Sequence, residues 1–597
     1  MISFADARRY FGPNPHAGDP VIAFDFRIDR AGNPDLEIHA ARMADSFGAW
    51  WRGTPRRPEE SMELFVARYL VEWSLAALNE VRGFIHSGGA RQTDDGIALW
   101  LGFHDPDLTQ ECLNLAAKFF VAAGRGPLNR EQADRIMGKF WGKCRVLHPD
   151  YQAKILMEAA RARDLPWLPF FRKLKIWQFG WGCRSARFFE SSSEEDSAIG
   201  ERIAGDKVLS KAYLHSMGAP VSTHMLVMGV NDLGTAAEKI GWPCVVKPID
   251  RGQARGVSVN IRDMEELTQA FAGARAVSSA PVMIESHVEG DVHRLLVVRG
   301  KFVAATRRDP AQVTGDGRST ILALGRAFND SRTATATPGS YLGPVPFDAD
   351  FDSALAKQGY SRDSVPEAGT KIRLRSIPLQ GTGAANTDVS HLVHPDIKFI
   401  VEALAETLCL KVVGFDYLTP DISRSYQEIG KFLEINLYPS LRGHLVDDRD
   451  VGGIGDIILG PKPARIPSML IIASQPEAEH YSSELLAQPG LGWRCGNSAG
   501  VGPVRLLINA RNPVNATRSL LTNAAVSRIV VICTPEELAS LGMPMDRVDV
   551  TMADDGKVDP VWLDVLRRHS GESIPLAAPE ELKQIVGLRL PQPSLRD

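Results

Sequence analysis

The sequence predicts a multidomain protein of mixed α/β and α+β architecture. The chain has 597 residues, and at about 150 residues per domain three or four domains are expected. Apolar runs with strand character alternate with stretches whose apolar residues recur at helical spacing, and glycine punctuates both. The segment GPKPARIPS at 460–468 contains three prolines, which predicts a linker before the last region.

The charge and cysteine content restrict the classes of partner. Lys and Arg total 68 against 72 Asp and Glu, so neither nucleic acid nor an anionic membrane is favoured, and a small or zwitterionic substrate fits better. The N-terminus lacks the apolar core of a signal peptide, and no apolar run approaches the ~20 residues that span a bilayer, so we expect a cytoplasmic protein. The seven cysteines include no Cys-x-x-Cys pair, which argues against a disulfide framework and a thiolate zinc site.

Residues 1–165 are predicted to form an N-terminal α/β module. VIAFDFRID at 21–29 has the composition of a strand, and ELFVARYLVEWSLAALNEV at 63–81 has apolar residues at helical spacing. The central region, 166–462, contains a helix with a glycine stop at 206–218 and a strand at 242–250. Small and turn-forming residues at 329–350 predict a mobile loop or lid.

The last region, 463–597, is predicted to contain a parallel sheet. Strand runs SMLIIA, VRLLINA and RIVVICT alternate with helical stretches there, which is the rhythm of parallel β-sheets covered by helices.

Two strands of the central region carry a cluster of oxygen ligands. KVVGFDYLT at 411–419 contains Asp416, and KFLEINL at 431–437 contains Glu434 and Asn436. Strand side chains alternate, so Glu434 and Asn436 share one face, with Leu433 and Ile435 on the other. If the strands pair as a hairpin, the two carboxylates converge, and such a cluster suits Mg²⁺. A solvated strand face with fortuitous acids is the alternative.

A glycine-containing loop after another strand could approach phosphates. The strand-like segment WPCVVKPID carries Lys247 near its end and leads into the loop Arg251-Gly-Gln-Ala-Arg-Gly256. Another lysine, Lys207, lies upstream. Glycine lets backbone N–H groups approach phosphate, and lysine adds point charge. Alone this signal is weak, because a lysine at a strand end often extends to solvent. Downstream, Glu285 follows an apolar strand, Arg294 opens another, and Arg307 with Arg308 closes a third.

The order of these residues resembles the ATP-grasp fold, and the surrounding segments resemble cyanophycin synthetase. The resemblance covers most of the chain and is most specific for residues 159–445. The segments that carry it are AARARDLPWLP, WQFGWGCRSARFFE, GDKVLSKAYLHSMGAPV, VVKPIDRGQARGVSVNI, EGDVHRLLVVRGKFVAATRRDPAQVTGDGRSTI, TDVSHLVHP and LEINLYPSLRGHL.

The resemblance implies a role for each matched residue in binding ATP and Mg²⁺. It implies that Arg294 and Arg308 face the transferring phosphoryl group, whose spread negative charge needs cations. ATP binding is implied for Lys207, Lys247, Gly252, Arg255, Gly256, Glu285 and His287, and Mg²⁺ binding for Asp416, Glu434 and Asn436.

Several positions depart from the family pattern. A zinc-binding His-x-x-Glu-His can occur on an N-terminal helix of the family, but here Tyr69 and Trp73 replace the imidazoles and cannot bind zinc. Glu194-Glu-Asp196 stands where the family has a Ser-Lys-Thr type stretch that holds the polymer end. Ala254 replaces a glycine of the phosphate loop, and PLQGTGAAN at 378–386 lacks the expected Asn and Ser.

The tail departs most from the family. In cyanophycin synthetase a Mur-ligase-like half follows, whose first strand leads into a phosphate loop with glycine and lysine. Here RIPSMLIIA is followed by Ser474-Gln-Pro-Glu-Ala-Glu479, which has neither residue. We interpret 463–597 as a degenerate, truncated Mur-ligase-like region. An unrelated α/β domain is the alternative.

The resemblance therefore predicts an ATP-dependent carboxylate–amine ligase, most like the short cyanophycin synthetases that condense β-aspartyl-arginine. Two alternatives remain: an ATP-grasp peptide ligase for another substrate, as in natural-product assembly, and a non-catalytic nucleotide-binding scaffold. A homo-oligomer is expected, with a dimer favoured.

Overall fold

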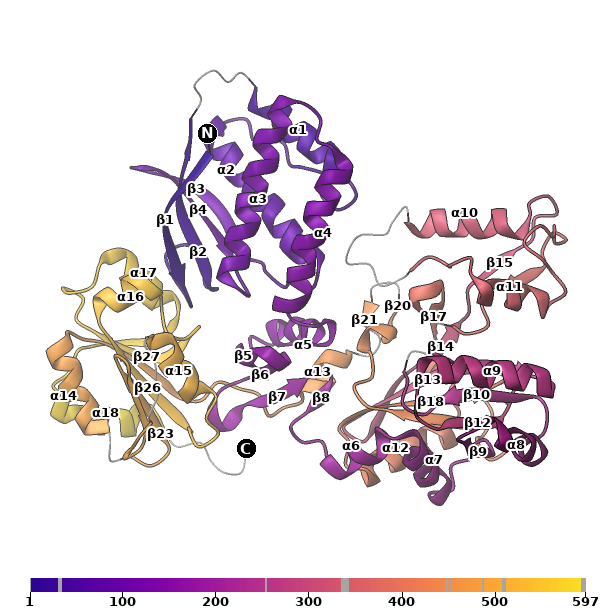
Figure 1. Ribbon diagram of the computed structural model, residues 1–597. Coiled ribbons are helices and arrows are strands. Elements are labelled where there is room, and N and C mark those ends of the chain that lie inside the picture. The colour runs from indigo at the N-terminus through magenta and orange to yellow at the C-terminus, as the bar shows by residue number, and fades with distance from the viewer. Residues whose placement is uncertain are drawn as a thin grey trace. The chain divides into compact units, whose positions relative to one another are not determined.

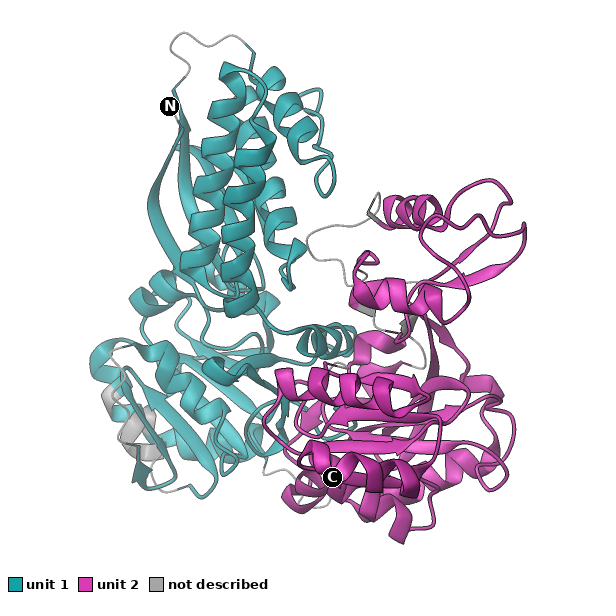
Figure 2. Ribbon diagram, turned by 45° about the vertical axis from the view of Figure 1, so that its right-hand side comes forward, with its two compact units in different colours: residues 1–189, 459–597 teal, residues 190–458 magenta. Residues whose placement is uncertain are grey.

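A computed structural model describes residues 2–29, 35–252, 255–333, 343–378, 380–446, 449–450, 453–485, 488–506 and 512–591. The chain forms two compact units, one from residues 1–189 with 459–597 and the other from residues 190–458 (Figure 2). The predicted multidomain mixed α/β architecture is confirmed: the described residues form seven sheets, and most of these have helices between their strands (Figure 1). Among the described residues, none of the helices has the length and apolar character that a membrane span requires.

The N-terminal part of the first unit is a four-stranded antiparallel sheet packed against helices. The strand order is β1-β2-β4-β3, and the strand and helix predicted at 21–29 and 63–81 are β2 and α2. Its elements are β1 (Ile2–Tyr10), β2 (Val21–Ile28), β3 (Gly88–Thr93), β4 (Gly96–Gly102), α1 (Leu36–Phe47), α2 (Met62–Glu80), α3 (Pro106–Arg125), α4 (Arg130–Leu147) and α5 (Tyr151–Ala162).

A short antiparallel sheet follows, and it belongs to the first unit although the central region was predicted to begin at 166. Its strands β5 (Trp167–Phe171), β6 (Ile176–Phe179) and β7 (Ala186–Phe189) pair in order. The buried Gln178 side chain of β6 donates a hydrogen bond to the carbonyl of Leu521, 2.8 Å away. Because buried amides require such partners, this bond holds the short sheet against the C-terminal part of the same unit.

The C-terminal part is a seven-stranded sheet with the order β25-β24-β23-β26-β22-β27-β28. Five neighbouring strands pair in parallel, as predicted, and β24 and β25 extend the sheet at one edge through antiparallel pairs. The predicted strand 504–510 begins as β25, and residues 507–511 lie outside the described residues. The elements are β22 (Ser468–Ile472), β23 (Leu491–Cys495), β24 (Ser498–Val501), β25 (Val504–Arg505), β26 (Arg528–Cys533), β27 (Val548–Ala553), β28 (Ser570–Pro575), α14 (Gln475–Leu485), α15 (Pro513–Leu521), α16 (Pro535–Leu541), α17 (Pro560–Arg568) and α18 (Leu582–Arg589).

The second unit contains two larger antiparallel sheets, with the orders β11-β10-β12-β9 and β17-β14-β13-β18-β19. It also contains two-stranded antiparallel pairs, β15 (Gln312–Thr314) with β16 (Lys371–Arg373) and β20 (Leu445–Val446) with β21 (Arg449–Asp450). Apolar residues of each sheet pack against helices in a core of its own. The strands are β9 (His224–Val227), β10 (Cys244–Pro248), β11 (Ser258–Ile261), β12 (Val282–Ser286), β13 (Asp291–Val298), β14 (Lys301–Asp309), β17 (Ala385–Asp388), β18 (Val412–Thr419) and β19 (Lys431–Asn436). The helices are α6 (Ala198–Ala204), α7 (Lys207–Ser216), α8 (Leu233–Ile240), α9 (Met264–Val277), α10 (Ile321–Thr333), α11 (Ala349–Ala356), α12 (Pro395–Thr407) and α13 (Ile454–Leu459).

The segment 329–350, predicted as a loop or lid, is partly helical. Residues 329–333 end α10, and residues 349–350 begin α11. Residues 334–342 lie outside the described residues. The lid therefore stays a prediction.

Candidate active site

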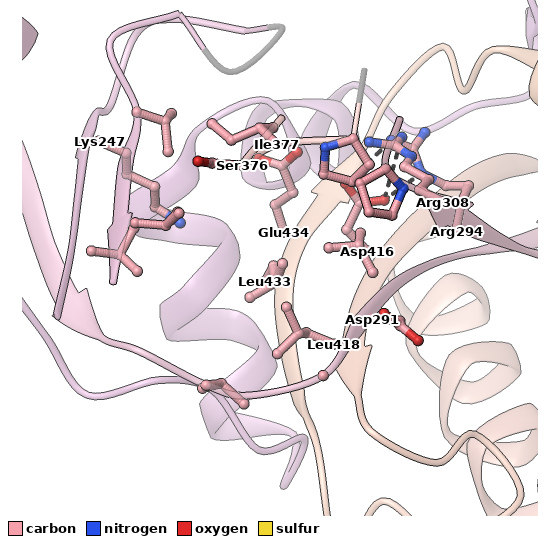
Figure 3. A pocket seen from close by; sticks show the side chains of 18 of the residues that line it. Lys247, Asp291, Arg294, Arg308, Ser376, Ile377, Asp416, Leu418, Leu433 and Glu434 are labelled. Carbon is pink, nitrogen blue, oxygen red and sulfur yellow. Dashed lines mark hydrogen bonds and ion pairs between the residues drawn. The ribbon is translucent and has the colours of Figure 1, made fainter. Parts of the chain in front are cut away.

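A large cavity of about 1260 Å³ lies in the second unit and is lined by strands of both sheets (Figure 3). Most of the residues singled out from the sequence line it. From the first sheet and its loops come Lys247, Gly252, Glu285 and His287; from the second sheet come Arg294, Arg308, Asp416, Glu434 and Asn436; and Lys207 begins helix α7.

The strands carrying Asp416 and Glu434 pair as the predicted hairpin, with these two residues directly opposite each other. The ladder shifts between Asp416 and Tyr417, because Tyr417 pairs with Phe432 and leaves Leu433 as an extra residue. Such a bulge breaks the alternation of side chains. The prediction that Leu433 lies on the core face with Ile435 is therefore wrong. Both residues border the cavity, but Leu433 is half-buried beside Glu434, whereas Ile435 is buried in the core.

The environment of the two carboxylates sets their charge states. Burial and the Asp416 carboxylate raise the pKa of Glu434, since two neighbouring negative charges repel. Burial opposes ionisation of Asp416 too, but Arg294 and Arg308 outweigh it and lower the pKa of Asp416. A cation shared by both carboxylates would relieve this repulsion.

The residues present fit Mg²⁺ bound together with a phosphate-bearing ligand. The buried amide nitrogen of Asn436 makes no hydrogen bond with the described residues, so its N–H groups are available to an acceptor such as a phosphate oxygen of this ligand. The described residues contain no cluster of three or more His, Cys, Asp or Glu that could hold a metal alone. Mg²⁺ usually takes one or two carboxylates plus phosphate oxygens and water, which matches this sparse donor set.

Two arginines, Arg294 and Arg308, approach the carboxylate of Asp416. Arg294 lies opposite Asp416 in the β13–β18 ladder and binds its carboxylate with Nε and with Nη2 at 3.2 Å. Arg308 of β14 approaches Asp416 with Nη2 at 3.9 Å. Gly414 leaves room for the arginine, since a Cβ there would lie 3.0 Å from Arg294 Cδ. Arg294 was predicted to open a strand, but it lies in the middle of β13.

The lysines face the cavity from the opposite side. Lys207 donates hydrogen bonds to the carbonyls of Pro248 and Arg251, which hold its ammonium group at the loop that follows β10. Lys247 projects from β10 and binds Glu285 at 2.6 Å. Burial lowers the pKa of Lys207. Figure 3 shows Lys247 on one side of Glu434 and Asp416 on the other.

A buried network around Glu285 includes two residues that the sequence analysis missed. Lys211 lies 2.8 Å from Glu285 and also donates to Ser222, whose hydroxyl donates to Glu285. Burial opposes ionisation of Glu285, but Lys247 and Lys211 outweigh it and lower its pKa to about 2. The signal for Lys211 was its position one helical turn after Lys207, on the same face.

Two residues assigned to ATP from the sequence are not among the residues that line the cavity. Arg255 is exposed, and its guanidinium contacts the carbonyl of Gly252 at 3.5 Å. Gly256 has φ +73, and a Cβ there would meet Val277 and Pro248 at 2.6 and 3.1 Å. Its role in the structure is therefore a tight turn. Ala254 lies outside the described residues.

The acids at 194–196 do not line the cavity. Asp196 accepts hydrogen bonds from the backbone N–H groups of Ser193, at 2.7 Å, and Lys411. Glu195 pairs with Arg299 at 3.2 Å. These two carboxylates hold the local chain together, so they do not face a ligand in this cavity.

The tail lacks a phosphate loop where the resemblance would place one. The carboxylate of Glu477 accepts hydrogen bonds from the N–H and hydroxyl of Ser474, at 2.9 and 2.6 Å. Glu477 thus caps the start of α14 from within the chain, and its negative charge stands where the helix would otherwise attract an anion.

The N-terminal helix α2 buries the residues that replace the zinc ligands. Tyr69 donates to the carbonyl of Ala40 at 2.7 Å, and Trp73 is fully buried. The intervening Glu72 is bound by Arg68 at 3.1 Å.

Comparison with known proteins gives the relatives of this chain. No family model matches it. It is 31% identical over 360 residues to cyanophycin synthetase of Trichormus variabilis, covering 59% of this chain and 39% of that protein. It is 31% identical over 325 residues to cyanophycin synthetase of Synechocystis sp., covering 53% and 37%. The chain is similar in sequence to cyanophycin synthetase over this part of its length. The predicted resemblance is confirmed over somewhat more than half of its length.

The similarity to cyanophycin synthetase is partial: the chain spans about two fifths of the length of these curated relatives. A shorter match, 29% identical over 207 residues, is to the bifunctional glutathione biosynthesis protein of Streptococcus agalactiae, covering 34% of this chain and 28% of that protein. Among solved structures, a bifunctional glutathione synthetase from Pasteurella multocida gives a TM-score of 0.39 at 17% identity, covering 59% of this chain and 50% of that one. D-alanine–D-alanine ligase from Bacillus anthracis gives 0.27 at 14%, covering 45% and 70%.

Proposed function

We propose that the protein is an ATP-dependent carboxylate–amine ligase that forms an amide bond through an acyl phosphate. The observation that carries this proposal is the pairing of Asp416 with Glu434 across from Lys207 and Lys247 in one cavity. Carboxylates for a divalent cation on one side and cations for phosphates on the other are what phosphoryl transfer requires.

Each group of side chains has a part in the proposed reaction. Bound MgATP would supply the phosphoryl group. Lys207 and Lys247 would hold the phosphate oxygens, for which Lys247 would exchange its contact with Glu285. Arg294 and Arg308 would neutralise negative charge as a substrate carboxylate oxygen bonds to the γ-phosphorus and ADP leaves. An amine would then bond to the acyl carbon, lose a proton and release phosphate.

Within this activity, we propose β-aspartyl-arginine as the substrate. Building an arginine-bearing polyaspartate from free amino acids needs two different amide syntheses, each with its own activated carboxylate. The second unit offers one candidate site. Glu477, although it pairs with Lys557 at 3.3 Å, caps the start of α14 where a triphosphate would have to bind, so the tail is not expected to offer the other. Arginine would then have to arrive already attached to aspartate.

The experiment compares two mixtures with the same enzyme, ATP and Mg²⁺. With β-aspartyl-arginine and a short primer we expect ADP, phosphate and longer oligomers, measured by phosphate release and mass spectrometry. With free aspartate and arginine we expect none. Glu434→Gln is the inactive control, and Glu428→Gln, at an exposed position paired with Arg424, is the matched active one.

Other results would replace the substrate or the activity. Efficient incorporation of the free amino acids would refute the argument from a single active site. Turnover with a different acid and amine would favour a ligase for another substrate; the engagement of Glu195 and Asp196 within the chain favours this rival, because they do not offer carboxylates to an arginine-bearing substrate in the cavity. ATP binding without any turnover would favour a scaffold. Light scattering tests the proposed homo-oligomer.

A further inference from the structure

A second cavity, of about 400 Å³, lies within the first unit. It is lined by loops of the N-terminal sheet, by β5 and β6, and by helix α15 of the C-terminal part. Its volume is in the range of small-molecule sites, about 300–1,000 Å³. All of its lining residues belong to the first unit, so the cavity is separate from the candidate active site.

The wall of this second cavity is aromatic on one side. Phe84 packs against Trp167, with ring centroids 6.0 Å apart, and Trp177 packs against His104 at 6.1 Å. The indole N–H of Trp177 is buried and has no hydrogen-bond partner among the described residues. Large aromatic surfaces with a few polar groups are typical of ligand pockets.

Helix α15, which also lines the second cavity, is held in place by hydrogen bonds. Gln178 of β6 donates to the carbonyl of Leu521 at 2.8 Å, and Arg187 of β7 donates to that of Thr522 at 2.6 Å. These bonds tie the C-terminal end of α15 to the short sheet that carries Trp177. The cavity between them is therefore built from fixed elements.

The positively charged side chain of Arg518 in α15 lines the second cavity and has no counter-ion among the described residues. Its half-buried guanidinium makes no hydrogen bond or ion pair with the described residues. Burial and the neighbouring positive charge of Arg172 lower its pKa. Arg172 also lines the cavity; it is half exposed and lies 3.8 Å from Asp105. A partly desolvated arginine beside another arginine favours an anion.

The acids that line the second cavity already have partners. Asp164 and Asp546 both bind Arg465, and Asp19 accepts a hydrogen bond from Ser87 at 2.5 Å. They do not neutralise Arg518, so the charge left over in the cavity is positive.

We propose that this second cavity binds a small molecule that carries a carboxylate or phosphate on an apolar, planar body. Arg518 and Arg172 hold the anionic group, and Trp167 and Trp177 contact the body. The guanidinium of Arg518 can donate two parallel hydrogen bonds to such a group. This site is independent of the proposed ligase activity.

The test measures binding of four probes to the full-length protein by calorimetry and ligand-observed NMR. The probes are benzoate, phenyl phosphate, inorganic phosphate and benzyl alcohol. We expect benzoate or phenyl phosphate to bind more tightly than inorganic phosphate or benzyl alcohol, because both the charge and the body contribute. Whichever of benzoate and phenyl phosphate binds more tightly shows whether the cavity prefers a carboxylate or a phosphate.

Variants locate the binding. Arg518→Gln should lower the affinity for the aromatic anion at least tenfold, and Arg518→Lys should lower this affinity less. Arg567→Gln, at an exposed position paired with Asp555 at 3.4 Å, should leave the affinity unchanged. Lys247→Gln should also leave it unchanged, since Lys247 lines the other cavity. Removing an unpaired, half-buried cation should not lower the melting temperature, so loss of binding would not reflect unfolding.

Several results would overturn the proposal. They are unchanged affinity in Arg518→Gln, loss of affinity in Lys247→Gln, equal binding of benzyl alcohol, equal binding of inorganic phosphate, or no binding of either aromatic anion at millimolar concentration.

Discussion

Asp416 and Glu434 face each other across β18 and β19, and the buried Asp416 and the half-buried Glu434 differ in their neighbours. Arg294 and Arg308 compensate Asp416, whereas Glu434 keeps a raised pKa. The negative charge of the pair is therefore only partly compensated, and a divalent cation bound to both carboxylates would compensate the rest.

The first prediction concerns Glu434→Gln. The variant should keep the fold, and its rate of MgATP turnover should fall at least a hundredfold, because it lacks one negative charge that we assign to metal binding. A raised pKa means that the folded state binds the proton more tightly than the unfolded state. The wild-type free energy of unfolding should therefore fall as pH rises from about 4.5, the ordinary value, through the raised pKa. Glu434→Gln should remove this fall, measured by denaturant unfolding without Mg²⁺. Wild-type turnover in the folded variant would contradict the assignment.

The second prediction concerns the space that Gly414 leaves for Arg294. In Gly414→Ala the new Cβ would lie 3.0 Å from Arg294 Cδ and 3.1 Å from Pro439 Cβ, so the arginine must shift. We expect turnover to fall at least tenfold with little change in melting temperature. Gly273→Ala in helix α9, where a Cβ meets nothing within 4 Å, is the control; it should raise stability by about 1 kcal/mol and leave turnover unchanged. Equal turnover in both variants would refute a role for the position of Arg294.

The third prediction concerns the buried contact between Lys211 and Glu285. Lys211→Met removes one partner of a fully buried ion pair, which typically costs ~3–5 kcal/mol. Lys239→Met, at an exposed position of α8, should change stability little. Chemical denaturation compares the two. A loss below 1 kcal/mol in Lys211→Met would show that Ser222 and Lys247 suffice to compensate Glu285.

The fourth prediction is the pH dependence that Glu285 contributes. Its pKa is lowered from 4.5 to about 2, so the stability that it contributes is present above 4.5 and is lost as pH falls toward 2. Glu285→Gln should therefore flatten the acid limb of the stability curve between pH 4.5 and 2. An unchanged slope in that range would mean that the network does not hold Glu285 ionised.

The fifth prediction concerns the capped start of α14. Glu477→Ala should lower stability by about 1 kcal/mol, and Glu477→Gln, which keeps an acceptor, should lower it less. Titration with a non-hydrolysable ATP analogue should give one site per chain, because Lys207 and Lys247 of the second unit are the one set of lysines to which we assign phosphate binding. Two sites per chain, with the second lost on changing the tail, would contradict the assignment.

The absence of zinc from the N-terminal part also stays a prediction. Tyr69 and Trp73 are core residues of α2, and neither can replace imidazole as a zinc ligand. Elemental analysis of protein purified without metal-affinity steps should find no stoichiometric zinc.

The sequence alone determined the main elements and the composition of the candidate site. Apolar content predicted β18, alternation predicted β19, and helical spacing predicted α2 and α7. The resemblance that the order of charged residues bears to the ATP-grasp fold predicted which side chains would meet. These signals are local or follow the chain order, so they can be derived without knowing how the chain folds in space.

Tertiary structure alone decided how these residues meet. The bulge that turns Leu433 into the cavity depends on the register between two strands. The partners of Asp196 include the backbone of Lys411, more than two hundred residues away. The cavity around Arg518 forms where loops of the N-terminal sheet, the short sheet and α15 pack together. Burial and charge pairing are set by neighbours that are distant in sequence, and a local pattern does not contain them.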